Sequence, residues 1–345
     1  MQITPQIIDP AKYSGWDDLI LSLKDYTFFH SSAWVKVLSE SYGYSPLFFT
    51  LFHHNHLMGF IPLMEVRSVL TGRRGISLPF SDYCWPIIDE KEHFEKILNE
   101  IIQYGTKRRW KYIELRGGDD FLDTSASSAR FYGHTLVLGR NPDVIFRAFK
   151  GSTRRNIKKA IKENVKIHIS HSLDSVREFY KLNSITRKYH GLPPQPFSFF
   201  KNAHKHIISR GKGLVVLASF ETRNIAGAVY FHFGGKAIYK YGASERSNQN
   251  KRPNNLIMWE AIKWYCEKGF EDFSFGRTEP ENNGLLQFKR GWDTKETVLR
   301  YYKYDLRKRA FIVDHSSVER FSRIFRKMPV PLLKLLGSVL YRHVG

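Results

Sequence analysis

A weak internal repeat restricts the fold of this chain more than any single motif does. Residues 47–62 (LFFTLFHHNHLMGFIP) align without gaps to residues 215–230 (VVLASFETRNIAGAVY), and Gly59 then falls on Gly227. Each copy consists of two β-prone runs joined by a short polar turn, which predicts a β-hairpin. We therefore expect the same hairpin to occur twice.

A helix and a strand follow each hairpin in the same order. Gly105 ends a helical pattern before residues 110–117 (WKYIELRG), and Gly269 ends one before residues 270–277 (FEDFSFGR). Glycine just past a helical pattern is typical of a C-terminal cap, and the alternation that follows indicates a strand. The length of 345 residues also favours two domains over one. The sequence thus predicts a duplicated α/β unit.

The charge balance indicates anionic partners. The chain has 54 Lys and Arg against 33 Asp and Glu, a net charge of +21, which favours nucleic acid, a phosphorylated carrier or an anionic membrane without choosing among them. Cys84 and Cys266 form no CxxC motif, which argues against a disulfide framework and fits a reducing compartment. The histidines, including those at 53–56, show no ligand spacing, so no metal site is expected. Because neither a signal peptide nor a membrane-spanning run is visible, we expect a cytoplasmic location.

Five segments follow one another in an order typical of a known family. They are FHSSAWVKVL (29–38), LPFSDYCWP (78–86), FYKLNSITRKYHGLPP (179–194), AIYKYGAS (237–244) and GLLQFKRGW (284–292). Together they resemble the FemAB family of peptidoglycan-bridge aminoacyltransferases, which are related to the GNAT N-acyltransferases. The resemblance implies an α/β (α+β) fold with two tandem GNAT-like domains, each a mixed twisted sheet flanked by helices. The first domain would be residues 1–145, completed by 298–345, and the second, with the main acyl-transfer site, residues 146–297.

The resemblance implies an active site around Lys289. This lysine matches the Phe-Lys pair that the family uses near the reaction centre, with Phe288 packed inward beside it. Amine attack on an ester or thioester develops negative charge on the carbonyl oxygen, and a fixed cation there lowers the barrier; a solvated surface lysine is the alternative. Tyr239 and Tyr241 match the pair that contacts the acceptor. Two apart on a strand, they should point to one face and Lys240 to the other, unless one of them packs in the core.

Four further charged residues are candidates for the site. Lys36 and Arg187 resemble the positions that hold the diphosphate of a nucleotide-linked acceptor, although two basic surface residues are unremarkable in so basic a chain. Asp82, in PFSDY, follows an expected strand end, where a carboxylate can orient the amine or take its proton; it can equally be a turn residue. Arg277 also follows a strand end, where it can hold a carboxylate or phosphate or simply pair with Glu279.

Arg252, Asn254 and Asn255 occupy the place where ordinary GNAT enzymes bind the pyrophosphate of coenzyme A on a glycine-rich turn before a helix. The segment here, SNQNKRPNN (247–255), contains no glycine. Asn254 is expected to cap the helix that follows. The missing glycines favour aminoacyl-tRNA over acyl-CoA as the acyl donor, and no tightly bound cofactor is expected.

Two basic segments offer surfaces for an anionic partner. Residues 150–166 carry seven basic residues against Glu163, with Ser152 as the expected N-cap; they form either a charged outer helix or a patch for tRNA phosphates. Residues 316–345 form two short amphipathic stretches, broken at Pro329 and Pro331 and flanked by Lys and Arg. This tail suits peripheral docking on an anionic bilayer or docking on the first domain.

These observations predict a cytoplasmic acyltransferase that moves an aminoacyl or other acyl group onto an amine. The acceptor is expected to be a cell-envelope or surface-polysaccharide precursor, and the anionic donor or acceptor to be tRNA or a diphosphate-linked molecule. One alternative is an acyl-CoA-dependent GNAT N-acyltransferase. The other is a non-catalytic module that binds nucleic acid or membrane, which would leave Lys289 and the two tyrosines without a role.

Overall fold

A computed structural model describes residues 4–54, 56–313 and 322–344 as two compact units. Unit 1 comprises the described residues of Met1–Phe131, Val298–Ser316 and Val339–Gly345, and unit 2 those of Tyr132–Thr297 and Ser317–Ser338. The first boundary falls earlier than residue 145 because strand β7 (Ala129–Val137) leaves unit 1 and pairs within unit 2. Residues 316–321 of the expected tail lie outside the described residues.

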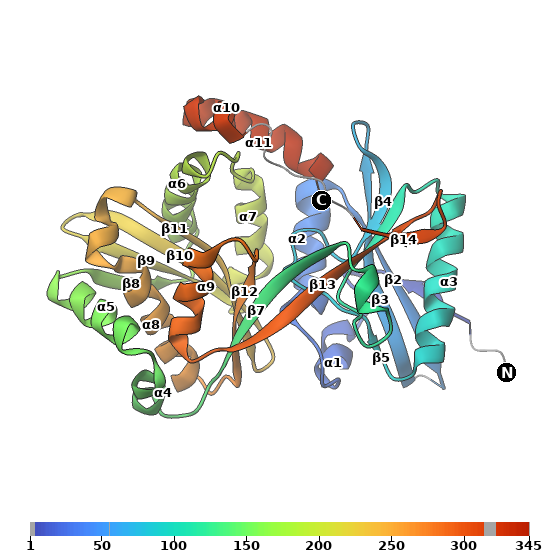
Figure 1. The fold of residues 1–345 in the computed structure, drawn as a ribbon, viewed down its shortest axis with the longest axis horizontal. Coiled ribbons are helices and arrows are strands. Elements are labelled where there is room, and N and C mark those ends of the chain that lie inside the picture. Colours follow the sequence, from blue (N-terminus) through green and yellow to red (C-terminus); the bar gives the residue numbers. More distant parts are fainter. Residues whose placement is uncertain (1–3, 55, 314–321, 345) are drawn as a thin grey trace. The chain divides into compact units, whose positions relative to one another are not determined.

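Unit 1 is a mixed sheet with helices on both faces (Figure 1). Its strand order is β1-β2-β3-β4-β6-β13, in which β4 and β6 run parallel; β5 also pairs with β3 and β14 with β13. The elements are β1 (Gln6–Ile8), α1 (Trp16–Leu21), η1 (Phe28–His30), α2 (Ser32–Tyr42), β2 (Ser45–His53), β3 (His56–Ser68), β4 (Gly72–Ile76), β5 (Ile87–Ile88), α3 (Lys91–Lys107), β6 (Tyr112–Arg116), η2 (Thr124–Ala126), most of β13 (Lys295–Asp305) and β14 (Ala310–Ile312).

A continuous apolar run in strand β2 explains how both faces of this sheet are covered. Phe49 packs into the cluster that includes Phe94 of α3. Its neighbour Phe48 points to the other face, where its ring lies 5.4 Å from that of Trp16 in α1. Both phenylalanines are fully buried, so the strand reads as a continuous apolar run rather than as an alternation of polar and apolar residues.

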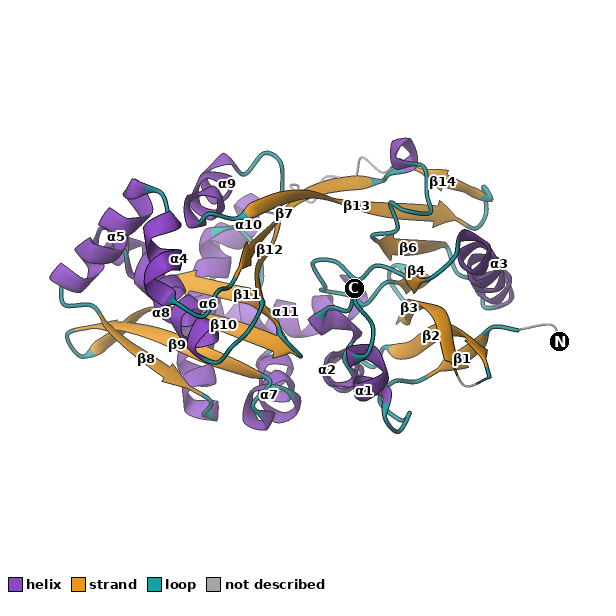
Figure 2. Ribbon diagram, turned by 90° about the horizontal axis from the view of Figure 1, so that it is seen from below, coloured by secondary structure: helices purple, strands orange, loops and turns teal. Residues whose placement is uncertain are grey.

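Unit 2 has the strand order β7-β12-β11-β10-β9-β8, in which β11 and β12 run parallel. Helices again cover both faces: α6 and α7 lie on one side of the strands and α5 and α8 on the other (Figures 1 and 2). The elements are α4 (Pro142–Ala148), α5 (Gly151–Lys162), β8 (Lys166–Ser170), α6 (Leu173–Tyr189), α7 (Phe197–His206), η3 (Ile208–Arg210), β9 (Gly213–Phe220), β10 (Arg223–Phe233), β11 (Lys236–Ser244), η4 (Arg246–Lys251), α8 (Pro253–Glu267), β12 (Asp272–Thr278), α9 (Asn283–Lys289), η5 (Arg290–Trp292), α10 (Ser322–Lys327) and the first part of α11 (Val330–Val344).

The duplicated architecture expected from the repeat is confirmed. The order β2-β3-β4-β6 in unit 1 matches β9-β10-β11-β12 in unit 2, and the two aligned hairpins are β2–β3 and β9–β10. In both sets the first three strands are antiparallel and the last pair is parallel. The next strand of each sheet comes from the other half of the sequence, because β13 pairs with β6 and β7 pairs with β12.

The two glycines expected at helix ends differ in their roles. Gly269 follows α8 with φ of 77°, as predicted for a C-terminal cap. Gly105 instead lies inside α3, which continues to Lys107. A Cβ at Gly105 would lie 2.8 Å from the ring of Trp110. The first glycine is therefore a packing requirement and not a helix terminator, and its prediction as a cap is wrong.

Helix α11 has a buried face and an exposed apolar face. In unit 2, Leu333 is fully buried and Gly337 lies against the backbone of Pro194. In unit 1, the carbonyl of Tyr341 accepts a hydrogen bond of 2.9 Å from the Tyr44 hydroxyl. Leu335 remains 61% exposed. Within the described part of the chain, no helix combines the length and the apolar character needed to cross a bilayer.

Candidate active site

The sheet of unit 2 opens where β11 and β12 diverge. The two parallel strands pair at three positions that end with Ile238 and Ser274. Beyond them β12 continues against β7, with Arg277 opposite Gly133, and no further β11–β12 pair occurs among the described residues. Divergence of two parallel strands exposes backbone groups at a sheet interior, which is a common place for a ligand in α/β folds.

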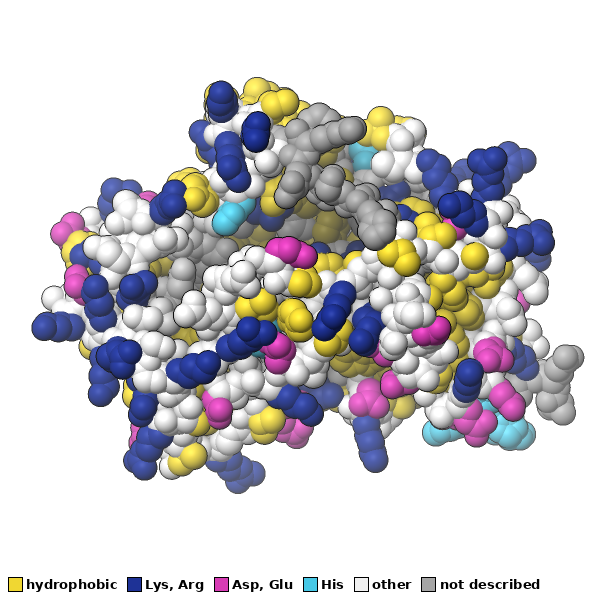
Figure 3. Space-filling view, viewed as in Figure 1, with side chains coloured by type: hydrophobic (Ala, Val, Ile, Leu, Met, Phe, Trp, Pro, Cys, Tyr) yellow, Lys and Arg dark blue, Asp and Glu magenta, His cyan; other side chains and the backbone are white. Residues whose placement is uncertain are grey.

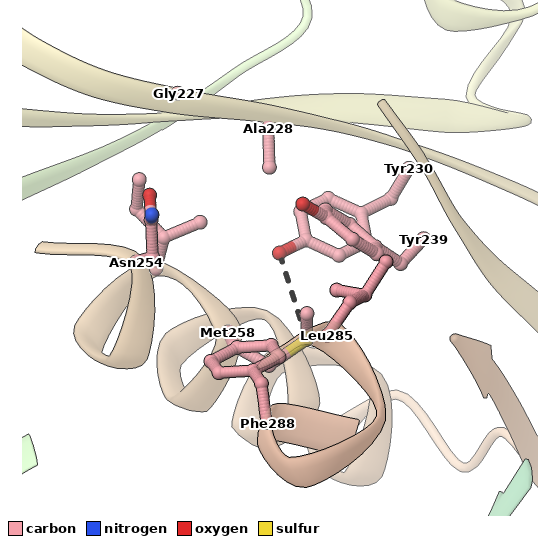
Figure 4. Close-up of a pocket in the computed structure, with 9 residues that line it drawn as sticks. Gly227, Ala228, Tyr230, Tyr239, Asn254, Met258, Leu285 and Phe288 are labelled. Carbon is pink, nitrogen blue, oxygen red and sulfur yellow. Dashed lines mark hydrogen bonds between the residues drawn. The ribbon is translucent and has the colours of Figure 1, made fainter. Parts of the chain in front are cut away.

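A cavity of about 130 Å³ lies on the α8 side of this region. Figure 4 shows Tyr230 and Tyr239 reaching into it from β10 and β11, above Met258 of α8 and Phe288 of α9. Its lining residues are Gly227, Ala228, Tyr230, Tyr239, Asn254, Ile257, Met258, Leu285 and Phe288. Three of the residues predicted for the site, Tyr239, Asn254 and Phe288, therefore lie around one cavity.

Tyr239 and Tyr241 do not share a face of β11, which corrects the expectation from their spacing. The register against β10 shifts at this point, so that Val229 pairs with Tyr241 but the next residue, Tyr230, pairs with Tyr239. Lys240 is the extra residue of a β-bulge, and a bulge reverses the alternation of side chains along a strand. Tyr239 therefore turns to the cavity, and Tyr241 packs on the opposite side.

The surroundings of the two phenols follow from this bulge. Tyr241 packs against Phe199 and Phe200 of α7, with its ring 5.5 Å from that of Phe200. The ring of Tyr239 lies 5.5 Å from that of Tyr230, whose hydroxyl contacts the Met258 sulfur. Burial raises the pKa of Tyr239 to about 12, so at neutral pH its hydroxyl is protonated and available as a donor.

Lys289 ends helix α9 and is buried. Asn282 caps this helix by accepting a hydrogen bond of 3.1 Å from the Leu285 amide. The Lys289 side chain is only 2% exposed, and its Nζ donates to the carbonyls of Gly276 (2.9 Å) and Arg277 (3.0 Å). A solvated surface lysine is therefore excluded, and a fixed cation lies where β12 leaves β11.

The carbonyls that hold Lys289 belong to a second bulge. Ser274 pairs with Thr135 and Arg277 with Gly133, so three steps along β12 correspond to two along β7. Gly276 adopts the left-handed conformation there, with φ of 67°, which glycine reaches without steric cost. The side chain opposite this bulge is His134, which belongs to none of the motifs singled out in the sequence.

His134, Glu296 and Arg290 form a charged cluster beside Lys289. His134 is buried, and its Nε2 lies 2.9 Å from Glu296 Oε2. Arg290 donates to both oxygens of that carboxylate, at 2.6 and 2.8 Å. Burial and the nearby Lys289 ammonium lower the pKa of His134 below its ordinary value, although Glu296 opposes them. The imidazole is therefore neutral at neutral pH.

The segment before α8 departs from the prediction in one respect. Arg252, in the left-handed conformation with φ of 59°, is the N-cap, and Pro253 is the first helical residue. Asn254 is not the cap; its side-chain amide donates to Ser244 Oγ at 3.3 Å. Asn255 is buried. Proline at the first position needs no partner for an amide hydrogen, which explains why the helix begins there.

Of the four other charged residues predicted for the site, two lie in unit 1 and two in unit 2. Lys36 is half-buried on α2, and Asp82 is half-buried in the loop after β4, where its carbonyl accepts a 2.8 Å hydrogen bond from the Tyr301 hydroxyl. In unit 2, Arg187 ends α6 and its Nε donates to the Pro193 carbonyl at 3.4 Å, while Arg277 is half-buried on β12. No cluster of His, Cys, Asp and Glu suited to a metal ion occurs in the parts of the chain that the structure describes.

The basic segment at residues 150–166 is mostly helical in the structure. Residues 150–166 include helix α5, whose N-cap is Lys150 without a side-chain hydrogen bond, so Ser152 is not the cap. Ile157 and Ala160 are buried against α8, whereas Ile161 is 55% exposed. The buried face of this helix is therefore narrow, and most of its basic residues are exposed.

Comparison with known proteins agrees with this geometry. Residues 147–290 match the model of a family described as an acetyltransferase (GNAT) domain. The crystal structure of FemX superposes with a TM-score of 0.69 at 14% identity, covering 87% of this chain and 97% of that one, which establishes the fold. The fold of this chain is therefore that of FemX, and residues 147–290 resemble a GNAT domain. Its two units are the two GNAT-like domains of that fold.

Sequence relatives of this chain match over shorter regions. One is a lipid II:glycine glycyltransferase of Staphylococcus haemolyticus, 34% identical over 76 residues, which are 20% of this chain and 18% of the relative. Another is the UDP-N-acetylmuramoylpentapeptide-lysine N(6)-alanyltransferase of Weissella viridescens, 23% identical over 158 residues, or 45% and 46% of the two chains. The chain thus spans less than half the length of the curated relatives it matches.

His134 and Glu296 could not be recognised from the sequence, because they are far apart along the chain and belong to no motif. Their proximity arises only because β13 follows α9 and carries Glu296 towards the β7 side of the bulge. The sequence of β7 (ARFYGHTLV) contains no motif that would mark His134 as a functional residue. The signal lay in the pairing of strands and not in the residue types.

Proposed function

We propose that this protein is an acyltransferase that moves an aminoacyl or other acyl group onto an amine of a cell-envelope or surface-polysaccharide precursor. The observation that carries the proposal is the buried Lys289, held by two carbonyls beside Phe288, which lines the unit 2 cavity. The names of the two relatives, a glycyltransferase and an alanyltransferase, support the same class of reaction.

The reaction would proceed by direct attack of the acceptor amine on the acyl carbonyl. The new amide bond forms as the ester bond to tRNA (or the thioester bond to coenzyme A) breaks, so the tRNA hydroxyl (or the thiol) leaves and the amine gives up a proton. No covalent enzyme intermediate is required, because the amine is itself the nucleophile, so the protein contributes positioning and charge stabilisation. Lys289 supplies a fixed positive charge for the oxygen that becomes negative. Tyr239, protonated at neutral pH, supplies a neutral donor at the cavity wall.

The donor of the acyl group is proposed to be aminoacyl-tRNA, with acyl-CoA as the alternative. The α8 N-terminus lies at the cavity through Asn254, and a helix N-terminus favours an anion. The segment before it lacks the glycines of a coenzyme A site, and Lys251 is engaged with Glu163 at 3.3 Å. This leaves Arg252 as the exposed cation at the entrance of the helix.

The acceptor is proposed to be a diphosphate-linked precursor, and Lys36 in unit 1 and Arg187 in unit 2 are each proposed as a phosphate-binding residue. Arginine presents a planar fork that matches phosphate oxygens, and lysine a point charge. Asp82 is proposed to orient the amine or to take its proton. The net charge of +21 supports anionic partners on both sides of the reaction.

The experiment compares two labelled donors on the same acceptor. The purified chain is incubated with a ¹⁴C-aminoacyl-tRNA pool or with ¹⁴C-acetyl-CoA, each with UDP-N-acetylmuramoylpentapeptide, at 50 and 200 mM salt. We expect label transfer from the tRNA pool and a steep loss of binding at the higher salt. Transfer from acetyl-CoA alone would favour the alternative donor, and label transfer from neither donor counts against the proposal for this acceptor.

We propose further that the exposed face of α10 and α11 contacts an anionic membrane, which would place the enzyme at the inner face of the bilayer. Ile324 of α10 and Leu335 and Val339 of α11 are more than half exposed. Lys and Arg side chains lie beside exposed hydrophobic side chains over α10 in Figure 3. An amphipathic helix with basic flanks binds anionic headgroups through both contributions.

Point substitutions test this contact better than truncation does, because truncation would also remove the buried Leu333. We expect Leu335→Asp to reduce sedimentation with phosphatidylglycerol vesicles and to leave the melting temperature unchanged. Vesicles of phosphatidylcholine alone should bind weakly in both cases. Equal binding of the variant and the unmodified chain to phosphatidylglycerol would contradict the membrane contact.

A further inference from the structure

The charged cluster behind Lys289 has a defined proton arrangement. A carboxylate only accepts hydrogen bonds, so the 2.9 Å contact with Glu296 requires the hydrogen of His134 on Nε2. Nδ1 then carries a lone pair. It is buried and has no hydrogen-bond partner among the described residues.

Glu296 is held rigidly enough to fix this tautomer. Arg290 grips both of its oxygens, at 2.6 and 2.8 Å, and such a two-point pair restricts the carboxylate plane. The pKa of Glu296 lies below its ordinary value, chiefly because of the hydrogen bond from Arg290. The hydrogen bonds from Arg290 therefore favour the charged form of the carboxylate.

The charged groups that act on His134 come from three elements. Lys289 ends α9, Arg290 begins η5 and Glu296 lies on β13. Two of them are cations, and Lys289 cannot move away without leaving the carbonyls of the β12 bulge. A second positive charge on His134 would face a buried ammonium in surroundings of low polarity, where like charges repel strongly.

We propose that His134 is a positioning residue for Lys289, and that the lysine stays on the Gly276 and Arg277 carbonyls only while the His134 imidazole is neutral. Its meaning for catalysis rests on the proposed acyl transfer. Acidification would then displace the lysine and switch the site off, whereas Glu296 limits how readily this happens.

The first test needs no substrate, so its failure is distinct from a failure of the proposed reaction. In the full chain labelled with ¹⁵N-lysine, a buried hydrogen-bonded ammonium gives an NH₃⁺ cross-peak, and Lys289→Met identifies the peak of Lys289. We expect this peak to shift or vanish in one step as the pH falls below the ordinary histidine range. The His134 ring signal should titrate with the same midpoint.

Two variants decide the matter. His134→Gln can still donate to Glu296 but does not titrate, so the step in the Lys289 peak should disappear. Glu296→Gln removes the charge that favours the imidazolium, so the step should move to lower pH. His168→Gln, at an exposed position of β8, should leave the step unchanged.

A Lys289 peak that keeps the same step in His134→Gln would overturn the proposal. If that variant does not fold, Glu296→Gln decides alone: a step at lower pH supports the proposal, and an unmoved step overturns it. If His134 had only a structural role, these variants would change the stability of the protein without moving the pH step in the Lys289 peak.

Discussion

Tyr239 and Tyr241 lie on opposite faces of β11, although a single residue separates them. Lys240 between them is the extra residue of a β-bulge, and it replaces the usual two-residue alternation by a local reversal. As a consequence, the two tyrosines have different surroundings. Tyr239 lines the cavity, and Tyr241 packs against Phe199 and Phe200 of α7.

Removal of each hydroxyl should therefore have different consequences. We expect Tyr239→Phe to lower the rate of acyl transfer by about fivefold, the effect of losing roughly 1 kcal/mol from one hydrogen bond. Tyr241→Phe should change the rate less than twofold, because its ring packs against Phe199 and Phe200. Rates under single-turnover conditions measure both. A larger loss in Tyr241→Phe than in Tyr239→Phe would refute this assignment.

A substitution at Gly242 tests the role of Tyr239 independently. A Cβ at this position would overlap the Tyr239 hydroxyl oxygen, so Gly242→Ala should push the phenol out of place and lower the rate about as much as Tyr239→Phe does. Because the clash involves the hydroxyl, adding Gly242→Ala to Tyr239→Phe should cost little more.

The matched control for this substitution is Gly139→Ala, since nothing lies within 4 Å of a Cβ there. It should leave both rate and melting temperature unchanged. Additive losses in the double variant, measured by the same single-turnover assay, would show that Gly242→Ala acts on something other than Tyr239.

The sequence repeat predicted the fold well because each copy is a β-hairpin, whose two strands are adjacent in the sequence. Residues 47–62 and 215–230 form β2–β3 and β9–β10 as expected. The strand that completes each sheet is not local: β7 joins β12 and β13 joins β6. Pairing between strands so far apart in the sequence produces no periodic pattern. The sequence therefore could not show that the chain enters unit 2 before residue 145.

The site was predictable only where one motif contained it. Phe288 and Lys289 stand next to each other in one segment, GLLQFKRGW, and both could be selected from it. The face of Tyr241, the cap before α8 and the role of His134 depend on a bulge, on a left-handed Arg252 and on strand pairing. Each of these is set by tertiary packing that overrides local preference.

Acid should destabilise unit 2 through His232. Burial lowers the pKa of this histidine to about 4, below the ordinary value of about 6.5, so the folded state binds fewer protons than the unfolded one. The stability it contributes is present above pH 6.5 and is lost as the pH falls towards 4. The loss amounts to at most about 3 kcal/mol, and His134 and His190, also with lowered pKa values, add to it with the same sign.

Denaturant unfolding at pH 7.5, 5.5 and 4 measures this dependence. In His232→Gln the stability at pH 7.5 should be lower, because the hydrogen bonds to Gly211 and Tyr265 are weakened, but the decline with pH should be shallower. The exposed His168→Gln should retain the original slope. An equally steep decline in His232→Gln would mean that other groups, such as paired carboxylates, dominate the acid limb.

Lys289→Met separates the chemical role of the lysine from its structural one. The substitution keeps most of the volume but leaves the Gly276 and Arg277 carbonyls without their charged donor, so we expect a loss of about 1.5–3 kcal/mol in the free energy of unfolding. Acyl transfer by the folded fraction should fall by a factor on the order of 10²–10³, the scale for losing one donor to a developing oxyanion. Lys295→Met makes the same change at an exposed position of β13 and should alter neither quantity. Lys289→Arg keeps the charge but not the geometry, so it should recover stability more fully than rate. If Lys289→Met loses stability but its folded fraction transfers acyl groups at the original rate, the lysine only braces the β12 bulge, and the positive charge that the mechanism requires must come from another residue.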